Sequence, residues 1–187
     1  MARIGVFICH CGLNIAGTID VPRVVEALRT VPGVALAADY KYRCSDPGQA
    51  LVLESIESHS LDGVVVAACS PSLHEVTFRR AAKAAALNPY RVEIANNREQ
   101  ISWPHRDEPE AATHKAIEVV RMAVEKVRGD EPLTPLTLPI TRRALVVGGG
   151  IAGLTAALDI ADAGYPVLLV EREEQLGGKM AQLSSLY

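Results

Sequence analysis

One stretch in the last quarter of the 187-residue sequence constrains the fold more than any other. An apolar run leads into Gly148, Gly150 and Gly153, and a second apolar run over 166–170 is followed by Glu171. The spacing G-x-G-x-x-G between a strand and a helix, with an acid after the next strand, is typical of the first βαβ unit of a dinucleotide-binding domain. The sequence therefore predicts two parallel strands joined by a helix.

Each residue type in this pattern has a physical reason. The first glycine permits a tight turn, the second lets the backbone approach a pyrophosphate, and the third lets the helix pack against the strand. The start of the helix stabilises phosphate charge, and Glu171 is expected to accept hydrogen bonds from ribose hydroxyls. The residues expected to bind the cofactor are Gly148, Gly150, Ile151, Ala152, Gly153, Glu171, Arg172, Gly178 and Lys179.

The loop after the acid indicates which dinucleotide is bound. Glu171 is followed by Leu176-Gly177-Gly178, which resembles the second part of the FAD fingerprint in flavoproteins with two dinucleotide domains. FAD is therefore favoured over NAD. Little sequence follows this loop, so we expect an incomplete FAD site that holds the adenosine and pyrophosphate end but has no pocket for the flavin ring.

The sequence divides at a proline-rich segment. Residues 129–141 contain prolines at 132, 135 and 139 and little periodic pattern, which predicts a linker between a domain over 1–128 and the truncated FAD-binding unit over 142–187. Strands alternate with helices in the first domain, so the fold class is α/β with a small parallel sheet. The predicted strands are 3–8, 34–42, 63–68 and 90–94, and the predicted helices are 19–30, 49–58, 74–86 and 109–128.

Composition narrows the function. A net charge of −3, with 22% charged residues, gives no electrostatic reason to expect nucleic acid or an anionic membrane as a partner. The apolar run near residue 5 is too short to span a membrane and has no signal-peptide cleavage pattern. We therefore expect a cytoplasmic protein, in which four cysteines are more typical of ligands or redox groups than of disulfides.

The four cysteines follow strands. Cys9 and Cys11 come after the first predicted strand, Cys44 after the second and Cys69 after the third, with turn-forming residues beside them. Because parallel strands end at one edge of a sheet, these thiols are expected to converge there. Four thiolates are the ligand set of an iron–sulfur cluster, with [4Fe–4S] favoured and [2Fe–2S] also compatible.

Other interpretations of the cysteines stay open. They could be buried apolar side chains, ligands of a tetrahedral zinc, or, for Cys9 and Cys11, a redox-active pair. The sequence lacks the paired Cys-x-x-Cys knuckles usual in structural zinc sites, so cluster ligation is favoured. His10 is a candidate for tuning the site by hydrogen bonding, and segments 96–99 and 103–105 are candidates for a docking loop.

Taken together, these segments resemble the amino-terminal part of the heterodisulfide reductase A-type polypeptide, an iron–sulfur flavoprotein. That family also includes related electron-transfer flavoproteins of anaerobic sulfur and aromatic-acid metabolism. The matching segments are Ile8–Gly12, Asn14–Gly17, Asp39–Gly48, Ala68–Pro71, Leu73–Glu75, Asn88–Tyr90 and Val146–Gly153.

The resemblance implies an oxidoreductase component that contains FAD and an iron–sulfur cluster, in some members the site of flavin-based electron bifurcation. Its expected partners are the other subunits of a heterodisulfide-reductase-like complex, which reduce disulfides, and an electron-donor module; self-association is left open. The sequence departs from the family in lacking the rest of the flavin domain and the ferredoxin-like inserts of longer relatives, so we expect no catalysis from this region alone. The alternative function is a docking module whose four-cysteine site holds zinc or nothing.

Overall fold

The computed structural model describes residues 2–183. The chain divides into two compact units, one ending at Thr134 and the other beginning at Pro135. Residues 130–143 contain no helix or strand, and residues 131–143 are exposed. The last four residues of the predicted 142–187 unit lie outside the described residues.

The first unit is built on a four-stranded sheet in the order β2-β1-β3-β4, with every neighbouring pair parallel. The strands are β1 (Ile4–Cys9), β2 (Val34–Tyr40), β3 (Gly63–Ala68) and β4 (Val92–Asn96). β1 and β3 lie in the middle, and every residue in both is buried. The apolar run over 63–68 thus lies inside the parallel sheet, where both faces of a strand are covered.

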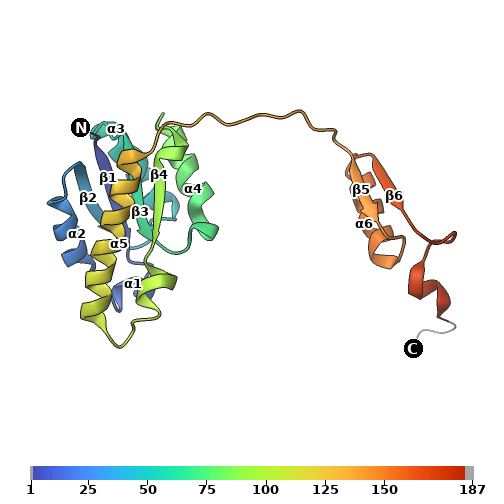
Figure 1. The fold of residues 1–187 in the computed structure, drawn as a ribbon, viewed down its shortest axis with the longest axis horizontal. Helices are drawn as coiled ribbons and strands as arrows, with labels where there is room; N and C mark the ends of the chain where they lie inside the picture. The colour runs from blue at the N-terminus through green and yellow to red at the C-terminus, as the bar shows by residue number, and fades with distance from the viewer. Residues whose placement is uncertain (1, 184–187) are drawn as a thin grey trace. The chain divides into compact units, whose positions relative to one another are not determined.

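Helices cover both faces of this sheet (Figure 1). On one face α2 (Val21–Arg29) and α5 (Pro109–Gly129) pack against Ile4, Val6 and Ile8 of β1. On the other face lie α3 (Asp46–Ser58) and α4 (Pro71–Ala84), and alternation along the strand turns Phe7 and Cys9 towards them. The position of Cys9 in the period-2 pattern thus places its thiol on the α3/α4 face.

Several element boundaries differ from the prediction because capping residues decide them. α3 and α4 each begin three residues earlier than expected, since Ser45 and Ser70 accept hydrogen bonds from backbone N–H groups and each helix has a proline in its first two positions. β4 starts two residues later, after the 3₁₀ turn η1 (Pro89–Arg91). The short helix α1 (Leu13–Ala16) and the π-helix η2 (Arg98–Ser102) were not predicted.

The second unit is the predicted βαβ arrangement. β5 (Ala144–Val147) pairs in parallel with β6 (Val167–Val170), and α6 (Ile151–Asp162) connects them. A 3₁₀ segment, η3 (Gly178–Gln182), follows. The fold class predicted for both units is therefore confirmed.

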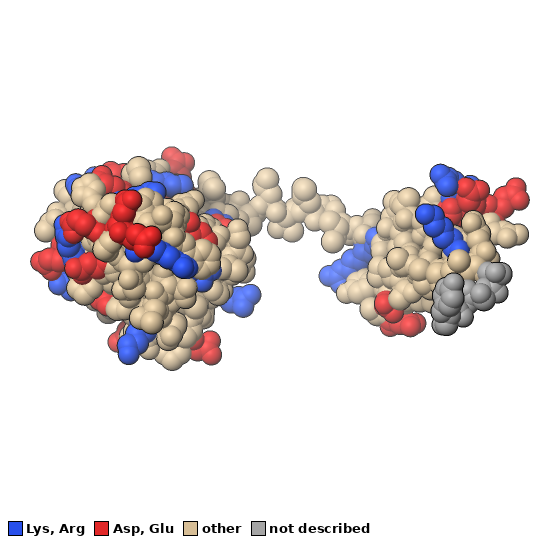
Figure 2. Space-filling view, turned by 90° about the horizontal axis from the view of Figure 1, so that it is seen from below, with Lys and Arg blue, Asp and Glu red and all other residues tan. Residues whose placement is uncertain are grey.

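Two surface properties complete the description. Acidic and basic side chains are interspersed over the visible face of the first unit (Figure 2). Among residues 2–183, none of the helices combines the length and the apolar character needed to cross a bilayer.

Candidate functional site

The four cysteines gather around one end of the α3/α4 core. Cys9 is the last residue of β1, rather than the residue after it, and Cys69 directly follows β3. Both are buried, with 3% and 5% of their surfaces exposed, within the apolar cluster between the sheet, α3 and α4. Cys11 and Cys44 are half-buried and pack against the same cluster. Topology thus brings together thiols that are up to sixty residues apart in the sequence.

These thiols are close enough to affect one another's ionisation. Burial raises the pKa of Cys9, and the neighbouring Cys11 and Cys44 raise it further. Burial also raises the pKa of Cys69 to about 11, with the same two cysteines contributing. All four are free thiols, and residues 2–183 contain no preformed metal-binding group of three or more His, Cys, Asp or Glu side chains.

Backbone groups around the cysteines favour negative charge on sulfur. Cys9 Sγ accepts hydrogen bonds from the backbone N–H of Cys11, at 3.3 Å, and of Arg43, at 3.4 Å. Cys44 and Cys69 each directly precede the capping serine of a helix, where the helix dipole is positive. Residues 45–48, expected to be a polar turn, instead form the cap and first turn of α3.

Two arginines also lie at the cysteines. Arg98, on η2, donates from Nη1 to Cys11 Sγ at 3.5 Å, and its guanidinium lies 5.0 Å from the ring centroid of Trp103. Arg43, in the turn before Cys44, is buried, and its guanidinium lies over the rings of Phe7 on β1 and Tyr40 on β2. Sequence reasoning placed Arg98 only in a docking loop and missed Arg43, because neither has a periodic or motif signal. His10 contacts Asp39 on β2, with Nε2 and Oδ2 2.6 Å apart.

The residue types at this end of the sheet are those that bind iron–sulfur clusters, and within residues 2–183 they do not form a closed metal-binding group. The four thiols come from three segments, at the ends of β1, β2 and β3; two of the thiols are sheltered from water, and N–H donors and cationic groups lie beside them. Iron–sulfur clusters are held by four cysteine thiolates, and such neighbours stabilise their negative charge. The chemistry of the donors, and not their geometry, therefore matches the group that the sequence predicts.

The glycine turn of the second unit has the compact geometry of a phosphate-binding turn. Gly148 has a φ of +104°, and a Cβ on Gly153 would overlap the Gly148 carbonyl oxygen, so both positions require glycine. A pocket of about 380 Å³ opens beside the turn and the start of α6. It is lined by Val147, Gly148, Gly150, Ile151, Ala152, Gly153, Gly177, Lys179 and Met180.

Glu171 stabilises this turn by accepting a hydrogen bond from its backbone. Its Oε2 accepts a hydrogen bond from the Gly149 N–H at 2.5 Å, and its Oε1 accepts from the N–H groups of Arg172 and Glu173. These backbone donors, Glu173 first, lower the pKa of Glu171. The Gly177 N–H donates to the Gly149 carbonyl at 2.7 Å, so the second glycine loop is joined to the first.

The remaining predicted cofactor residues behave differently from one another. Gly178 begins η3 and packs closely against Gly150, whereas the Arg172 side chain is exposed and forms an ion pair with Glu173 at 3.0 Å. The structure thus brings six of the nine predicted residues to the pocket. Glu171, Arg172 and Gly178 are outside its lining.

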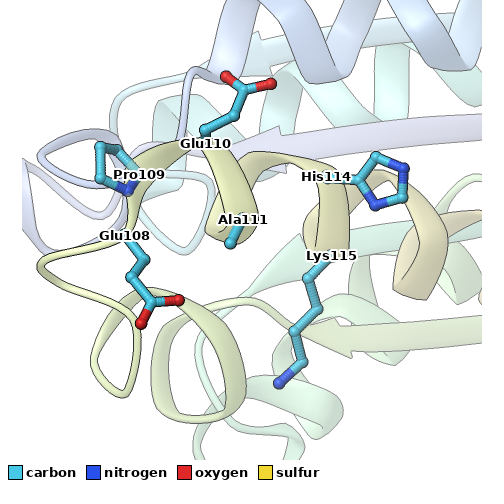
Figure 3. A pocket seen from close by; sticks show the side chains of 6 residues that line it. All are labelled: Glu108, Pro109, Glu110, Ala111, His114 and Lys115. Atoms are coloured by element: carbon cyan, nitrogen blue, oxygen red, sulfur yellow. The ribbon is translucent and has the colours of Figure 1, made fainter.

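A larger hollow, of about 630 Å³, lies at the start of α5, but its side chains do not converge (Figure 3). Glu108 and Glu110 point in opposite directions, and His114 and Lys115 point away from each other. Glu110 is already paired with Arg23 at 2.6 Å. We assign no chemistry to this hollow.

Comparison with known proteins gives matches over almost the whole chain. It is 55% identical over 99% of its length to the second iron–sulfur A-type component of the CoB–CoM heterodisulfide reductase of Methanopyrus kandleri. It is 49% identical to the A-type component of the H₂:CoB–CoM heterodisulfide, ferredoxin reductase of Methanothermobacter thermautotrophicus. It is 50% identical to a heterodisulfide-reductase-A-like protein of Archaeoglobus profundus. The chain is homologous to the amino-terminal portion of heterodisulfide reductase A-type polypeptides.

The homology to heterodisulfide reductase A-type polypeptides spans only part of those relatives, because the chain covers 28%, 28% and 26% of their lengths. A family model described as an NAD(P)-binding Rossmann-like domain matches residues 146–184. That match contains the glycine turn and its pocket. The four cysteines lie in the first unit, before the matched region.

Proposed function

We propose that this chain is the cluster-bearing and FAD-entry part of an electron-transfer subunit of the heterodisulfide reductase A type. The observation that carries the proposal is the set of four cysteines around one buried end of a parallel sheet. The name of one relative describes an iron–sulfur component, and the chain also has a dinucleotide turn.

The cluster ligands in this proposal are Cys9, Cys11, Cys44 and Cys69, with [4Fe–4S] favoured over [2Fe–2S]. A bound cluster supplies one-electron transfer. The chain's own contribution is to shelter Cys9 and Cys69 from water and to direct two backbone N–H groups at Cys9 Sγ. Both features tune the redox behaviour of a thiolate-bound metal centre.

The dinucleotide in this proposal is FAD, held at its adenosine and pyrophosphate end. Gly148, Gly150 and Gly153 form the turn, and Lys179 lies in the pocket wall, where its ammonium group suits a phosphate. Glu171 binds the ribose in this proposal, which requires its carboxylate to share the hydrogen bonds that it now makes to the turn. No described residue positions a flavin ring, so the region is not proposed to catalyse a reaction alone.

The proposed partners follow from the relatives' names. Those names describe components of heterodisulfide reductases, and four of them name ferredoxin or hydrogen as well. We infer that the chain works beside disulfide-reducing subunits and an electron-donor module, in the cytoplasm, where thiols stay reduced. Self-association is left open in this proposal, and the oligomeric state is to be measured.

The second candidate is a docking module with a zinc-bound or empty cysteine site. The empty form is favoured by one observation: within residues 2–183 the cysteines do not already form a closed metal-binding group. Metal content separates the two functions directly.

The test is anaerobic purification followed by iron, sulfide and zinc analysis and by EPR after reduction. We expect about four iron and four sulfide per chain for [4Fe–4S], and about two of each for [2Fe–2S]. Cys44→Ala should lose the iron and the colour, whereas Ser55→Ala, on the helix that follows Cys44, should keep both. Folded protein with four free thiols and no iron would refute the cluster, and one zinc per chain would establish the alternative.

A further inference from the structure

The least expected side chain in the first unit is a buried arginine. Arg43 is 2% exposed, the largest side chain among the fully buried residues. Its guanidinium carbon lies 5.1 Å from the ring centroid of Phe7 and 5.6 Å from that of Tyr40. Cation–π contacts of this kind recover only part of the free energy that is lost when a charge leaves water.

No anion within the described residues neutralises this charge at contact distance. Arg43 Nε has no hydrogen-bond partner, and none of the ion pairs among residues 2–183 includes Arg43. Asp39 is near enough to interact, but its carboxylate already contacts His10 at 2.6 Å. An unpaired buried charge is costly, so something absent from the polypeptide should balance it.

The position of Arg43 indicates what that balancing charge is. The residue precedes Cys44, its backbone N–H donates to Cys9 Sγ at 3.4 Å, and its guanidinium lies over Phe7, two residues before Cys9 on the same side of β1. As a neutral thiol, Cys9 offers no counter-charge. As a metal-bound thiolate it belongs to an anionic centre beside the arginine.

Arg98 supplies a second cation near the cysteines, but an acidic neighbour offsets its charge. It reaches Cys11 Sγ at 3.5 Å, but Glu99 Oε1 lies 2.7 Å from its Nη2 and offsets much of its charge. The Arg43 backbone and the Arg98 side chain therefore contact two different cysteines, and of these two arginines only Arg43 forms no ion pair within the part of the chain that the structure describes.

We propose that Arg43 is the built-in counter-cation of the cysteine-bound cluster and raises its reduction potential, with Arg98 making a smaller contribution. The inference rests on the proposed function. Adding an electron makes an already anionic centre more negative, and a fixed buried cation beside it favours that reduced state. Arg43 is not a cluster ligand. Its positive charge acts on the cluster by stabilising the negative charge of the thiolate ligands.

The test compares three variants of the cluster-loaded chain by anaerobic redox titration followed by EPR. Arg43→Met keeps the length and removes the charge, and we expect full iron content with a midpoint potential shifted to more negative values. Arg43→Lys keeps the charge and should stay close to the unmodified chain. The matched control is Arg79→Met, which removes an arginine 5.2 Å from the Tyr90 ring, beside the residues that precede β4, and should not shift the potential.

A second measurement separates charge from packing. In the metal-free, reduced chain, Arg43→Met should be at least as stable to heat as the unmodified chain, because it removes an unpaired buried charge. A purely structural arginine would instead lose stability in that form without moving the potential. An unchanged midpoint in iron-replete Arg43→Met overturns the proposal.

The remaining outcomes also decide. If Arg43→Met folds but loses iron, the proposal requires Arg43→Lys to retain it, and loss of iron from both folded variants overturns the charge role. Failure of the proposed function itself is seen earlier and separately, as an absence of iron in the unmodified chain.

Discussion

Both units contain parallel strands connected by helices, but they bury the apolar side chains of these elements to different extents. In the first unit every residue of β1 and β3 is buried, because helices cover both faces of the sheet. In the second unit β5 and β6 alternate between half-buried and exposed residues, and α6 has no buried residue. The apolar side chains with large exposure there include Leu145, Val147, Ile151, Leu158, Leu168 and Val170.

The difference separates what local sequence determines from what a core requires. A strand, a glycine turn and a helix form the βαβ path of the second unit, yet two strands and one helix provide only one covered face. The first unit has two apolar clusters, one on each side of its sheet. We therefore expect the first unit to be stable without the second. The second unit is expected to need contact with additional protein surface to become stable.

Separate expression of the two units, as residues 1–134 and 135–187, tests this difference most directly. The first should melt cooperatively, because it contains all the buried apolar side chains of the described chain. The second should melt without a cooperative transition, because it buries little apolar surface and such burial is the main stabilising contribution to folding. Circular dichroism melts and amide proton dispersion in NMR spectra measure both, and a cooperative melt of 135–187 would contradict the expectation.

The sequence was informative about elements because periodicity and turn residues are local signals. It predicted all six strands, their parallel arrangement and the glycine turn, including the packing of the helix at Gly153 against the strand, where a Cβ would lie 3.5 Å from Val146. It missed the true starts of α3 and α4, because Ser45 and Ser70 were interpreted as turn residues after cysteines when they are helix caps. Capping and turn chemistry use the same residue types.

The candidate site was predictable only in part. The convergence of the four cysteines followed from one rule, that parallel strands end at one edge. The placement of Arg43 over Phe7 and of Arg98 on Cys11 depends on tertiary packing, which has no sequence period. The same is true of Glu171, whose carboxylate bonds to the turn through side-chain geometry that spacing does not specify.

A matched pair of substitutions tests the same difference in burial at single side chains. Phe78 on α4 is 1% exposed, and Phe78→Ala should lower the free energy of unfolding of the first unit by about 3–5 kcal/mol. Leu168 on β6 is 50% exposed, and Leu168→Ala should change unfolding by no more than about 0.5 kcal/mol. Urea titration of the whole chain measures both, with tryptophan fluorescence reporting on the first unit and backbone amide NMR signals on the second. A large loss in Leu168→Ala would mean that the second unit has a core of its own.

The smallest expected effect is a pH dependence confined to the second unit. Backbone N–H groups of Glu173, Gly149 and Arg172 hold the pKa of Glu171 below its ordinary value, so its carboxylate stabilises the glycine turn when ionised. A group with a depressed pKa in the folded state contributes stability above its unfolded pKa of about 4.3, and that contribution is lost as the pH falls through the folded value. Carboxyl ¹³C titration of the whole chain should therefore show Glu171 titrating below about 4.3, with the Gly149 amide resonance moving over the same range.

Glu171→Gln should remove that amide response, whereas Glu174→Gln, in the same loop, should leave it in place. A Gly149 response that persists in Glu171→Gln would show that the turn keeps its geometry without the carboxylate, and the second unit would then be more self-sufficient than its exposed apolar side chains indicate.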